Sequence, residues 1–182
     1  SRFVDLNLNR LLGKDRRDMI GYELWVVDEL EKLVQDHDLL LDIHSMTSAD
    51  DCFVFNDNPW DSQELELCKA LGFDYVVWGW PDLYGWESWG STCEYACSLW
   101  KIAITVECYS HNDLRAPQKA YDAIWNFLSY FGVIKNYKTF PHNEAGKYVL
   151  IKTMVRKEKI WSFAIPRKNG DSIKKGELIG CY

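Results

Sequence analysis

The chain has 182 residues, of which 47% are hydrophobic and 15% aromatic, and a formal net charge of −6. This composition excludes a disordered chain and is enough for one medium-sized core with a small appendage. No stretch approaches the roughly 18 consecutive apolar residues of a membrane span, and the first residues lack the apolar centre of a signal peptide. Six cysteines are too few for a disulfide scaffold, so we expect reduced thiols in a cytoplasmic protein without a membrane partner.

Charge is divided unevenly along the chain. Residues 1–134 hold 10 Lys/Arg against 23 Asp/Glu, whereas residues 135–182 hold 11 against 4. This break predicts a domain boundary near residue 135. Nucleic acid is not an expected partner, because the lysines of the tail alternate with strand-like apolar residues and form no long basic run.

Helical and strand-like patterns alternate over the first 134 residues. Residues 20–36 place Leu24, Val27 and Val34 at helical spacing, and residues 39–45, LLLDIHS, form an apolar run typical of a strand buried on both faces. Further strands are predicted at residues 52–55, 73–80 and 101–109, and further helices at residues 61–72, 91–100 and 112–132. The helix at 91–100 would be capped by Ser91 or Thr92, and the helix at 112–132 by Asn112 or Asp113. The alternation predicts an α/β fold with a mainly parallel or mixed sheet and flanking helices.

The pattern changes after Tyr137. The segments YVLIKTMV, KIWSFAIP and SIKKGELIGCY are strand-like, and KNGD at 168–171 is typical of a hairpin turn. We therefore predict an α/β domain over residues 1–137 and a small all-β domain over residues 138–182.

Two polar residues close apolar strands of the predicted sheet. His44 ends the run LLLDI, and Glu107 ends the run KIAITV. Ligands of open parallel sheets bind beyond the carboxyl ends of strands, so both residues are site candidates. Taken alone, His44 is more typical of a hydrogen-bonded core histidine than of a ligand, and Glu107 is equally typical of one half of a buried ion pair. Asp42, two residues before His44, is predicted to share its face and to orient it.

A series of segments changes this balance. RFVDLNLNR (2–10), LLLDIHS (39–45), GSTCEYA followed by AITVECY (90–109), and PQKAYDAIWNFLSYFGVI (117–134) occur in that order. Together they resemble the succinylglutamate desuccinylase and aspartoacylase family of zinc-dependent deacylases, which have the zinc carboxypeptidase type of fold. The resemblance covers residues 1 to about 134.

The resemblance implies a role for each matching residue. His44 would be a ligand of one Zn²⁺ per chain, and Glu107 would carry protons as the catalytic carboxylate. Arg2 would help to stabilise the oxyanion, while Asn9 and Arg10 would bind a carboxylate of the substrate. The other two ligands of the family come from a His-x-x-Glu segment expected upstream of residue 1. We therefore expect the 182-residue chain to be N-terminally truncated and not to hold zinc tightly by itself.

Two features of the segment between His44 and Glu107 bear on the substrate. It contains no arginine, whereas aspartoacylases have one there for the side-chain carboxylate of their substrate. It is instead rich in aromatic residues: Trp60, Tyr75, Trp78, Trp80, Tyr84, Trp86, Trp89, Tyr95 and Trp100. An aromatic lining favours a bulky, apolar or cationic group.

We therefore expect a metal-dependent amidohydrolase whose partner is a small N-acylated substrate, an N-acyl amino acid or similar amide. Two alternatives stay open: a carboxypeptidase-like zinc peptidase, and a catalytically inactive binding module of the same fold. A homo-oligomer also stays open.

Overall fold

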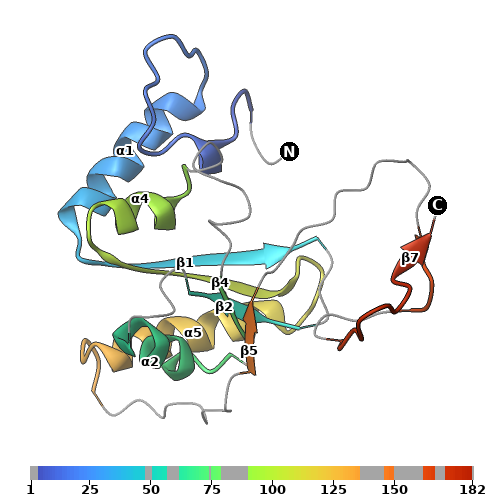
Figure 1. The fold of residues 1–182 in the computed structure, drawn as a ribbon. Coiled ribbons are helices and arrows are strands. Elements are labelled where there is room, and N and C mark those ends of the chain that lie inside the picture. Colours follow the sequence, from blue (N-terminus) through green and yellow to red (C-terminus); the bar gives the residue numbers. More distant parts are fainter. Residues whose placement is uncertain are drawn as a thin grey trace.

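A computed structural model of the chain describes residues 4–47, 51–56, 62–73, 75–78, 90–135, 146–149, 162–166 and 171–181. The described residues form three layers, with α1 (Glu23–Asp36) and α4 (Thr92–Ser98) on one face of a sheet and α2 (Ser62–Ala70) and α5 (Ala116–Tyr130) on the other (Figure 1). A short 3-10 helix, η1 (Leu8–Arg10), precedes α1. No helix in these ranges is both long and apolar enough to cross a membrane.

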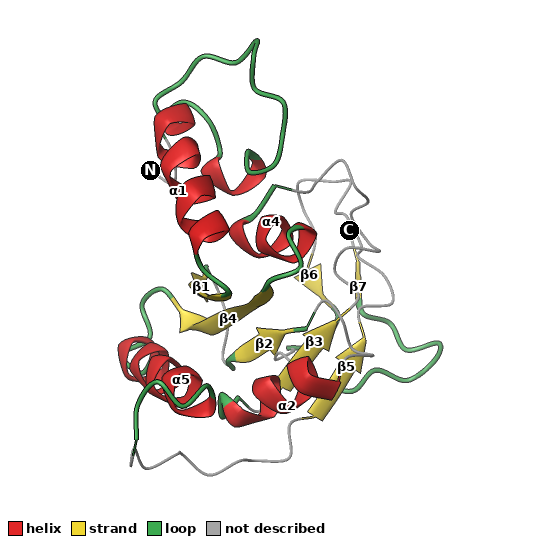
Figure 2. Cartoon of the chain, turned by 90° about the vertical axis from the view of Figure 1, so that its left-hand side faces the viewer, coloured by secondary structure: helices red, strands yellow, loops and turns green. Residues whose placement is uncertain are grey.

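The sheet is mixed, within the fold class predicted from the sequence. Its strand order is β1 (Leu39–Met46), β4 (Ile102–Ser110), β2 (Phe53–Phe55), β3 (Tyr75–Trp78) and β5 (Gly146–Val149). The pairs β1–β4, β2–β3 and β3–β5 are parallel, and β2 runs antiparallel to β4. Figure 2 shows the helices covering both faces of this twisted sheet.

The C-terminal segments differ in part from the predicted β domain. β5 lies inside the range 138–182 but extends the main sheet by pairing with β3. β6 (Ser162–Phe163) and β7 (Gly180–Cys181) form a separate antiparallel pair. Of the predicted turn at 168–171, residues 168–170 lie outside the described residues. The main sheet therefore continues past the boundary predicted at residue 137.

Helix α5 begins later than predicted. The Asp113 carboxylate accepts hydrogen bonds from the Arg115 backbone at 2.8 Å and from its guanidinium, which forms a turn ahead of the helix. Pro117 then occupies the first turn of α5, where its missing N–H costs nothing. Asp113 thus stabilises the approach to α5 instead of capping it.

The main core lies between the sheet and the α2/α5 layer. It contains Val54, Phe73, Ile104, Val106 and Phe127 among other buried residues. A smaller cluster, formed by Val34, Cys93, Ala96 and Ala103, fills the other face beneath α1 and α4. The apolar side chains of β4 therefore serve both layers, which explains why its sequence is a nearly continuous apolar run.

Five cysteines (Cys52, Cys68, Cys93, Cys97 and Cys108) are thiols in the described structure, as expected. Burial, with a smaller contribution from neighbouring Cys52, raises the pKa of Cys108 to about 12. Because the thiolate is the reactive form, we expect iodoacetamide at pH 8 to modify Cys108 at least about 10³-fold more slowly than an ordinary exposed thiol.

Peptide mass spectrometry over a time course measures this difference, with half-buried Cys97 as the internal comparison and the urea-unfolded chain as the control. Equal modification rates at Cys97 and Cys108 in the folded chain would contradict the raised pKa of Cys108.

The segment leading to η1 is held by the first residue of α1. The backbone N–H groups of Val4, Asp5 and Leu6 donate to the buried Glu23 carboxylate at 2.5 to 3.3 Å. Burial alone would raise the pKa of Glu23, but these backbone donors outweigh it and hold the pKa below its usual value. The anionic form of Glu23 therefore ties residues 4–6 to α1.

We expect Glu23→Gln to lower the thermal midpoint by several degrees at neutral pH, because the amide NH₂ faces backbone donors. A depressed carboxyl pKa contributes stability above the unfolded value of about 4.3, and this contribution is lost as pH falls through the folded-state pKa. The difference between variant and parent should therefore shrink below about pH 4. Thermal unfolding of both proteins, followed by circular dichroism from pH 3 to 8, tests this prediction. A difference in thermal midpoint that stays constant with pH would contradict the role of the Glu23 carboxylate.

Candidate active site

His44 and Glu107 are direct neighbours at the carboxyl ends of two parallel strands. Their Cα atoms are register partners in the β1–β4 pair. Leu40 and Ala103, four residues earlier on each strand, pack in the cluster beneath α4. Because side chains alternate across a strand, His44 and Glu107 both project from this α4 face. His44 is half-buried, and the Glu107 Oε2 atom is buried from solvent.

A carboxylate on the same strand orients His44. The Nε2 atom of His44 lies 3.0 Å from Asp42 Oδ1, as the two-residue spacing predicts. Thr92, the first residue of α4, donates its hydroxyl hydrogen to Asp42 Oδ2. Burial would raise the pKa of Asp42, but the hydrogen bond and attraction of His44, together with the Thr92 hydrogen bond, hold it below its usual value. Asp42 is therefore an anionic acceptor between α4 and His44.

The start of α4 is fixed by a capping box. The Ser91 side chain accepts from the Glu94 backbone at 3.2 Å, and the Glu94 carboxylate accepts from the backbone of Ser91 at 2.9 Å and of Gly90 at 2.8 Å. This confirms Ser91, the first of the two predicted caps. It also leaves the hydroxyl of Thr92 for its long-range contact with Asp42.

The Asn9–Arg10 segment lies against the chain that leads into α4. The Leu12 N–H donates to the Gly90 carbonyl at 3.1 Å, and the backbone of Arg10 fills the space where a Cβ on Gly90 would stand. Asn9 is half-buried, whereas the Arg10 side chain is exposed and donates to the Asn9 carbonyl. The predicted residue Arg2 lies outside the described residues. The fold thus brings Asn9 and Arg10 to the end of α4 that contacts Asp42.

Beyond Glu107 the strand contains a bulge that the sequence analysis did not predict. The β1–β4 register shifts between His44 and Met46, and Tyr109 has a φ of 58°. The ring of Tyr109 packs toward the main core, with the Arg115 guanidinium 4.1 Å from its centre. Bulges of this kind redirect side chains next to active sites.

The bulge brings His111 to the end of β1. The backbone N–H of His111 donates to the Met46 carbonyl at 2.8 Å, and its Nδ1 is hydrogen-bonded to Ser45 Oγ at 2.8 Å. His111 was not predicted as a site residue from the sequence, because its only local indication of such a role is its place in the polar stretch after Glu107. The pair ties together the ends of the two strands that carry His44 and Glu107.

The two described tryptophans of the predicted aromatic lining lie elsewhere. Trp78 packs against the main core on the α2/α5 face, and Trp100 is 97% exposed next to the amino end of β4, opposite to Glu107. Trp60, Trp80, Tyr84, Trp86 and Trp89 lie outside the described residues. An aromatic lining therefore does not come from Trp78 or Trp100.

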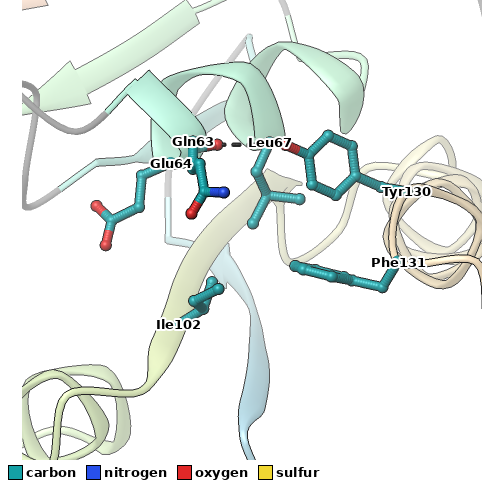
Figure 3. A pocket seen from close by; sticks show the side chains of 6 residues that line it. All are labelled: Gln63, Glu64, Leu67, Ile102, Tyr130 and Phe131. Carbon is teal, nitrogen blue, oxygen red and sulfur yellow. Dashed lines mark hydrogen bonds between the residues drawn. The ribbon is translucent and has the colours of Figure 1, made fainter.

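Two cavities near the amino ends of the strands are separate from this pair. One, of about 90 Å³, lies between α2, α5 and the start of β4, where the Tyr130 hydroxyl donates to the Gln63 carbonyl at 3.5 Å (Figure 3). Another, of about 210 Å³, lies between α1, α4 and the start of β1, with Thr92 in its wall. Neither is lined by His44 or Glu107.

The described residues contain no group of three or more His, Cys, Asp or Glu side chains placed to hold a metal ion. Cys93 and Cys97, one turn apart on α4, therefore do not belong to such a group within these ranges. The predicted ligand His44 lies beside the carboxylate of Asp42, and it would supply one of the three protein ligands that a catalytic zinc site uses.

Comparison with known proteins identifies the fold. No family model matches the sequence, and no curated protein matches it. Among solved structures, a succinylglutamate desuccinylase/aspartoacylase from Rhodobacter sphaeroides is 16% identical with a TM-score of 0.75, and covers 99% of this chain and 57% of its own. The product-bound ectoine utilization protein EutE (DoeB) from Ruegeria pomeroyi is 19% identical with a TM-score of 0.71, and covers 96% of this chain and 54% of its own.

A third structure, succinylglutamate desuccinylase from Vibrio parahaemolyticus, is 20% identical with a TM-score of 0.65, and covers 99% of this chain and 56% of its own. The chain thus spans about half the length of the solved proteins that it matches. At these identities the similarity is one of fold. The chain therefore has the fold found in structures of the succinylglutamate desuccinylase and aspartoacylase family, in agreement with the sequence resemblance.

Proposed function

We propose that residues 1–182 carry part of the active site of a zinc-dependent deacylase that hydrolyses the amide bond of an N-acyl amino acid or a similar small amide. The observation that carries the proposal is the pairing of His44, held by Asp42, with Glu107 at the carboxyl ends of adjacent parallel strands. Proteins of this fold that are named as deacylases support the reaction class.

The chemistry of His44 fits a zinc ligand. An ionised carboxylate can only accept hydrogen bonds, so the contact with Asp42 places the imidazole proton on Nε2 and the lone pair on Nδ1. Metal-binding histidines commonly donate their second ring nitrogen to a carboxylate in this way. When bound, zinc supplies polarisation of the amide carbonyl and lowers the pKa of water to about 7. The remaining ligands are proposed to come from a His-x-x-Glu segment that residues 1–182 do not include.

Glu107 is the proposed proton carrier. Its Oε2 atom is buried from solvent, so the carboxylate lies in a partly desolvated setting. Glu107 would accept a proton from the attacking water and pass it to the departing amine. Its place directly beside His44 lets one carboxylate serve both steps.

Substrate binding is assigned to the N-terminal segment. Asn9 and Arg10 are proposed to hold a substrate carboxylate, because the planar guanidinium forms two parallel hydrogen bonds with such a group. Arg2 is proposed to stabilise the oxyanion of the transition state.

We also propose a cytoplasmic location and a C-terminal β domain that includes the β6–β7 pair.

Zinc content and substrate preference test this proposal on the protein expressed with its complete coding sequence. We expect about one zinc per chain and faster hydrolysis of N-acyl amino acids than of short peptides. His44→Ala should remove the zinc, whereas His111→Ala at the same sheet edge should retain it. Preferred hydrolysis of peptides would favour the peptidase alternative. Absence of both zinc and turnover would favour the inactive binding module.

A further inference from the structure

The hydroxyl of Thr92 makes a long-range hydrogen bond that is unusual for a residue at the start of a helix. Thr92 is the first residue of α4, and the capping function belongs to Ser91 and Glu94. Threonine hydroxyls inside helices usually bond the carbonyl four residues earlier, which is not available within α4 at this position. The Thr92 hydroxyl instead reaches Asp42, 50 residues earlier in the chain.

The two oxygens of Asp42 have separate partners. Oδ1 accepts from His44 Nε2 at 3.0 Å, and Oδ2 accepts from the Thr92 hydroxyl. Rotation about the Cβ–Cγ bond moves both oxygens of Asp42, so each of these two hydrogen bonds opposes it, and loss of the Thr92 contact removes one of the two restraints. The Thr92 contact therefore fixes the plane in which Asp42 meets the imidazole.

The support behind Thr92 is rigid. The capping box fixes the first turn of α4, and the Gly90 carbonyl is bonded to the Leu12 backbone. On the same helix, Ala96 is fully buried in the cluster beneath α1 and α4. The position of the Thr92 hydroxyl is thus determined by packing of the whole helix against the sheet.

We propose that Thr92 is a positioning residue for His44: its hydroxyl orients Asp42 so that the imidazole keeps one tautomer and one ring orientation. The effect of this orientation of His44 on metal binding rests on the proposed function. The hydrogen-bond chain from Thr92 through Asp42 to His44 is a property of the fold and can be tested without metal.

The test is the ring N–H proton of His44, observed by NMR in the ¹⁵N-histidine-labelled 182-residue chain at about pH 8.5, where an ordinary histidine is neutral. His44→Gln identifies its signal. We expect a protected Nε2 proton in the parent chain. Thr92→Val, which keeps the side-chain shape but removes the donor, should speed solvent exchange of this proton about 10-fold or more. Thr92→Ser should restore the parent behaviour, because it returns the hydroxyl.

Ser91→Ala is the matched control, since it weakens the helix cap but leaves the Thr92 hydroxyl. It should lower the thermal midpoint but change exchange of the His44 proton much less than Thr92→Val does, because burial of Ala96 still holds α4 against the sheet. Unchanged exchange in Thr92→Val, or an equal change in Ser91→Ala, would overturn the proposal. If Thr92→Val does not fold, Thr92→Ala compared with Thr92→Ser decides between the same outcomes.

A second readout applies to the complete protein with zinc. There Thr92→Val should weaken zinc affinity by up to about 10-fold, because loss of a direct hydrogen-bond partner of a metal ligand commonly costs about 10–100-fold and Thr92 acts one step further out, through Asp42. If the complete protein holds no zinc, the proposed function fails while the NMR result for Thr92 stands. If zinc is present and the NMR result is negative, the role of Thr92 fails alone.

Discussion

Replacing Glu107 with glutamine is expected to lower turnover of N-acyl substrates by about 10²–10⁴-fold in the protein expressed with its complete coding sequence. Glutamine has nearly the same shape as glutamate but cannot accept a proton from water at neutral pH. Because the proposed ligand is His44 and not Glu107, zinc content should stay at the parent level. Steady-state kinetics together with metal analysis of the same sample measure both quantities.

A suitable control is Glu66→Gln, which removes an exposed carboxylate that pairs with Lys69 at 2.7 Å. Surface pairs of this kind contribute little, so activity and stability should change hardly at all. Parent-level activity in Glu107→Gln would end the assignment of Glu107 as the proton carrier. Loss of zinc together with activity would instead indicate that Glu107 supports the metal site.

The second large effect is expected at Gly90, where the chain enters α4. Gly90 has a φ of 136°, and a Cβ placed there would stand 2.5 Å from the Arg10 carbonyl carbon and 2.7 Å from its oxygen. Gly90→Ala would therefore combine an unfavourable backbone conformation, which costs about 1–3 kcal/mol, with overlap against main-chain atoms that cannot rotate away. The free energy of unfolding should fall by more than the strain alone.

Gly132→Ala measures the cost of a left-handed backbone without overlap against other atoms. Gly132 also has a positive φ, of 68°, but no atom lies within 4 Å of a Cβ placed there. Urea unfolding of both variants should show a clearly larger loss for Gly90→Ala, and hydrogen exchange should rise at Arg10 and Leu12, whose backbones contact Gly90. Equal losses in the two variants would show that contact with Arg10 does not matter.

The helices and most strands follow local patterns that the sequence makes visible. The apolar run before His44 became β1, and the spacing of Val27 and Val34 predicted α1. Ser91 was recognised as a cap because the capping box is local. The late start of α5 was missed because Asp113 has two local uses, as a helix cap or as a partner of Arg115, and the pattern does not distinguish them.

The candidate site was only partly predictable, because some of its contacts depend on tertiary packing and not on local sequence patterns. Parallel strand ends meet at one edge, so His44 and Glu107 could be expected to lie together. The contact of Thr92 with Asp42 depends on how α4 packs on β1, which no short-range pattern encodes. The meeting of His111 with Ser45 likewise depends on the bulge at Tyr109, a conformation that is rare for residues other than glycine.

The bulge at Tyr109 also limits which substitutions this position can accept over evolution. Its backbone conformation favours glycine or asparagine and disfavours β-branched residues, whereas its ring supplies the contact with Arg115 and the core. A replacement that suits the backbone loses the contact, and one that keeps an apolar contact through valine or isoleucine strains the backbone. In related sequences, we therefore expect residue 109 to change together with residue 115 more often than alone.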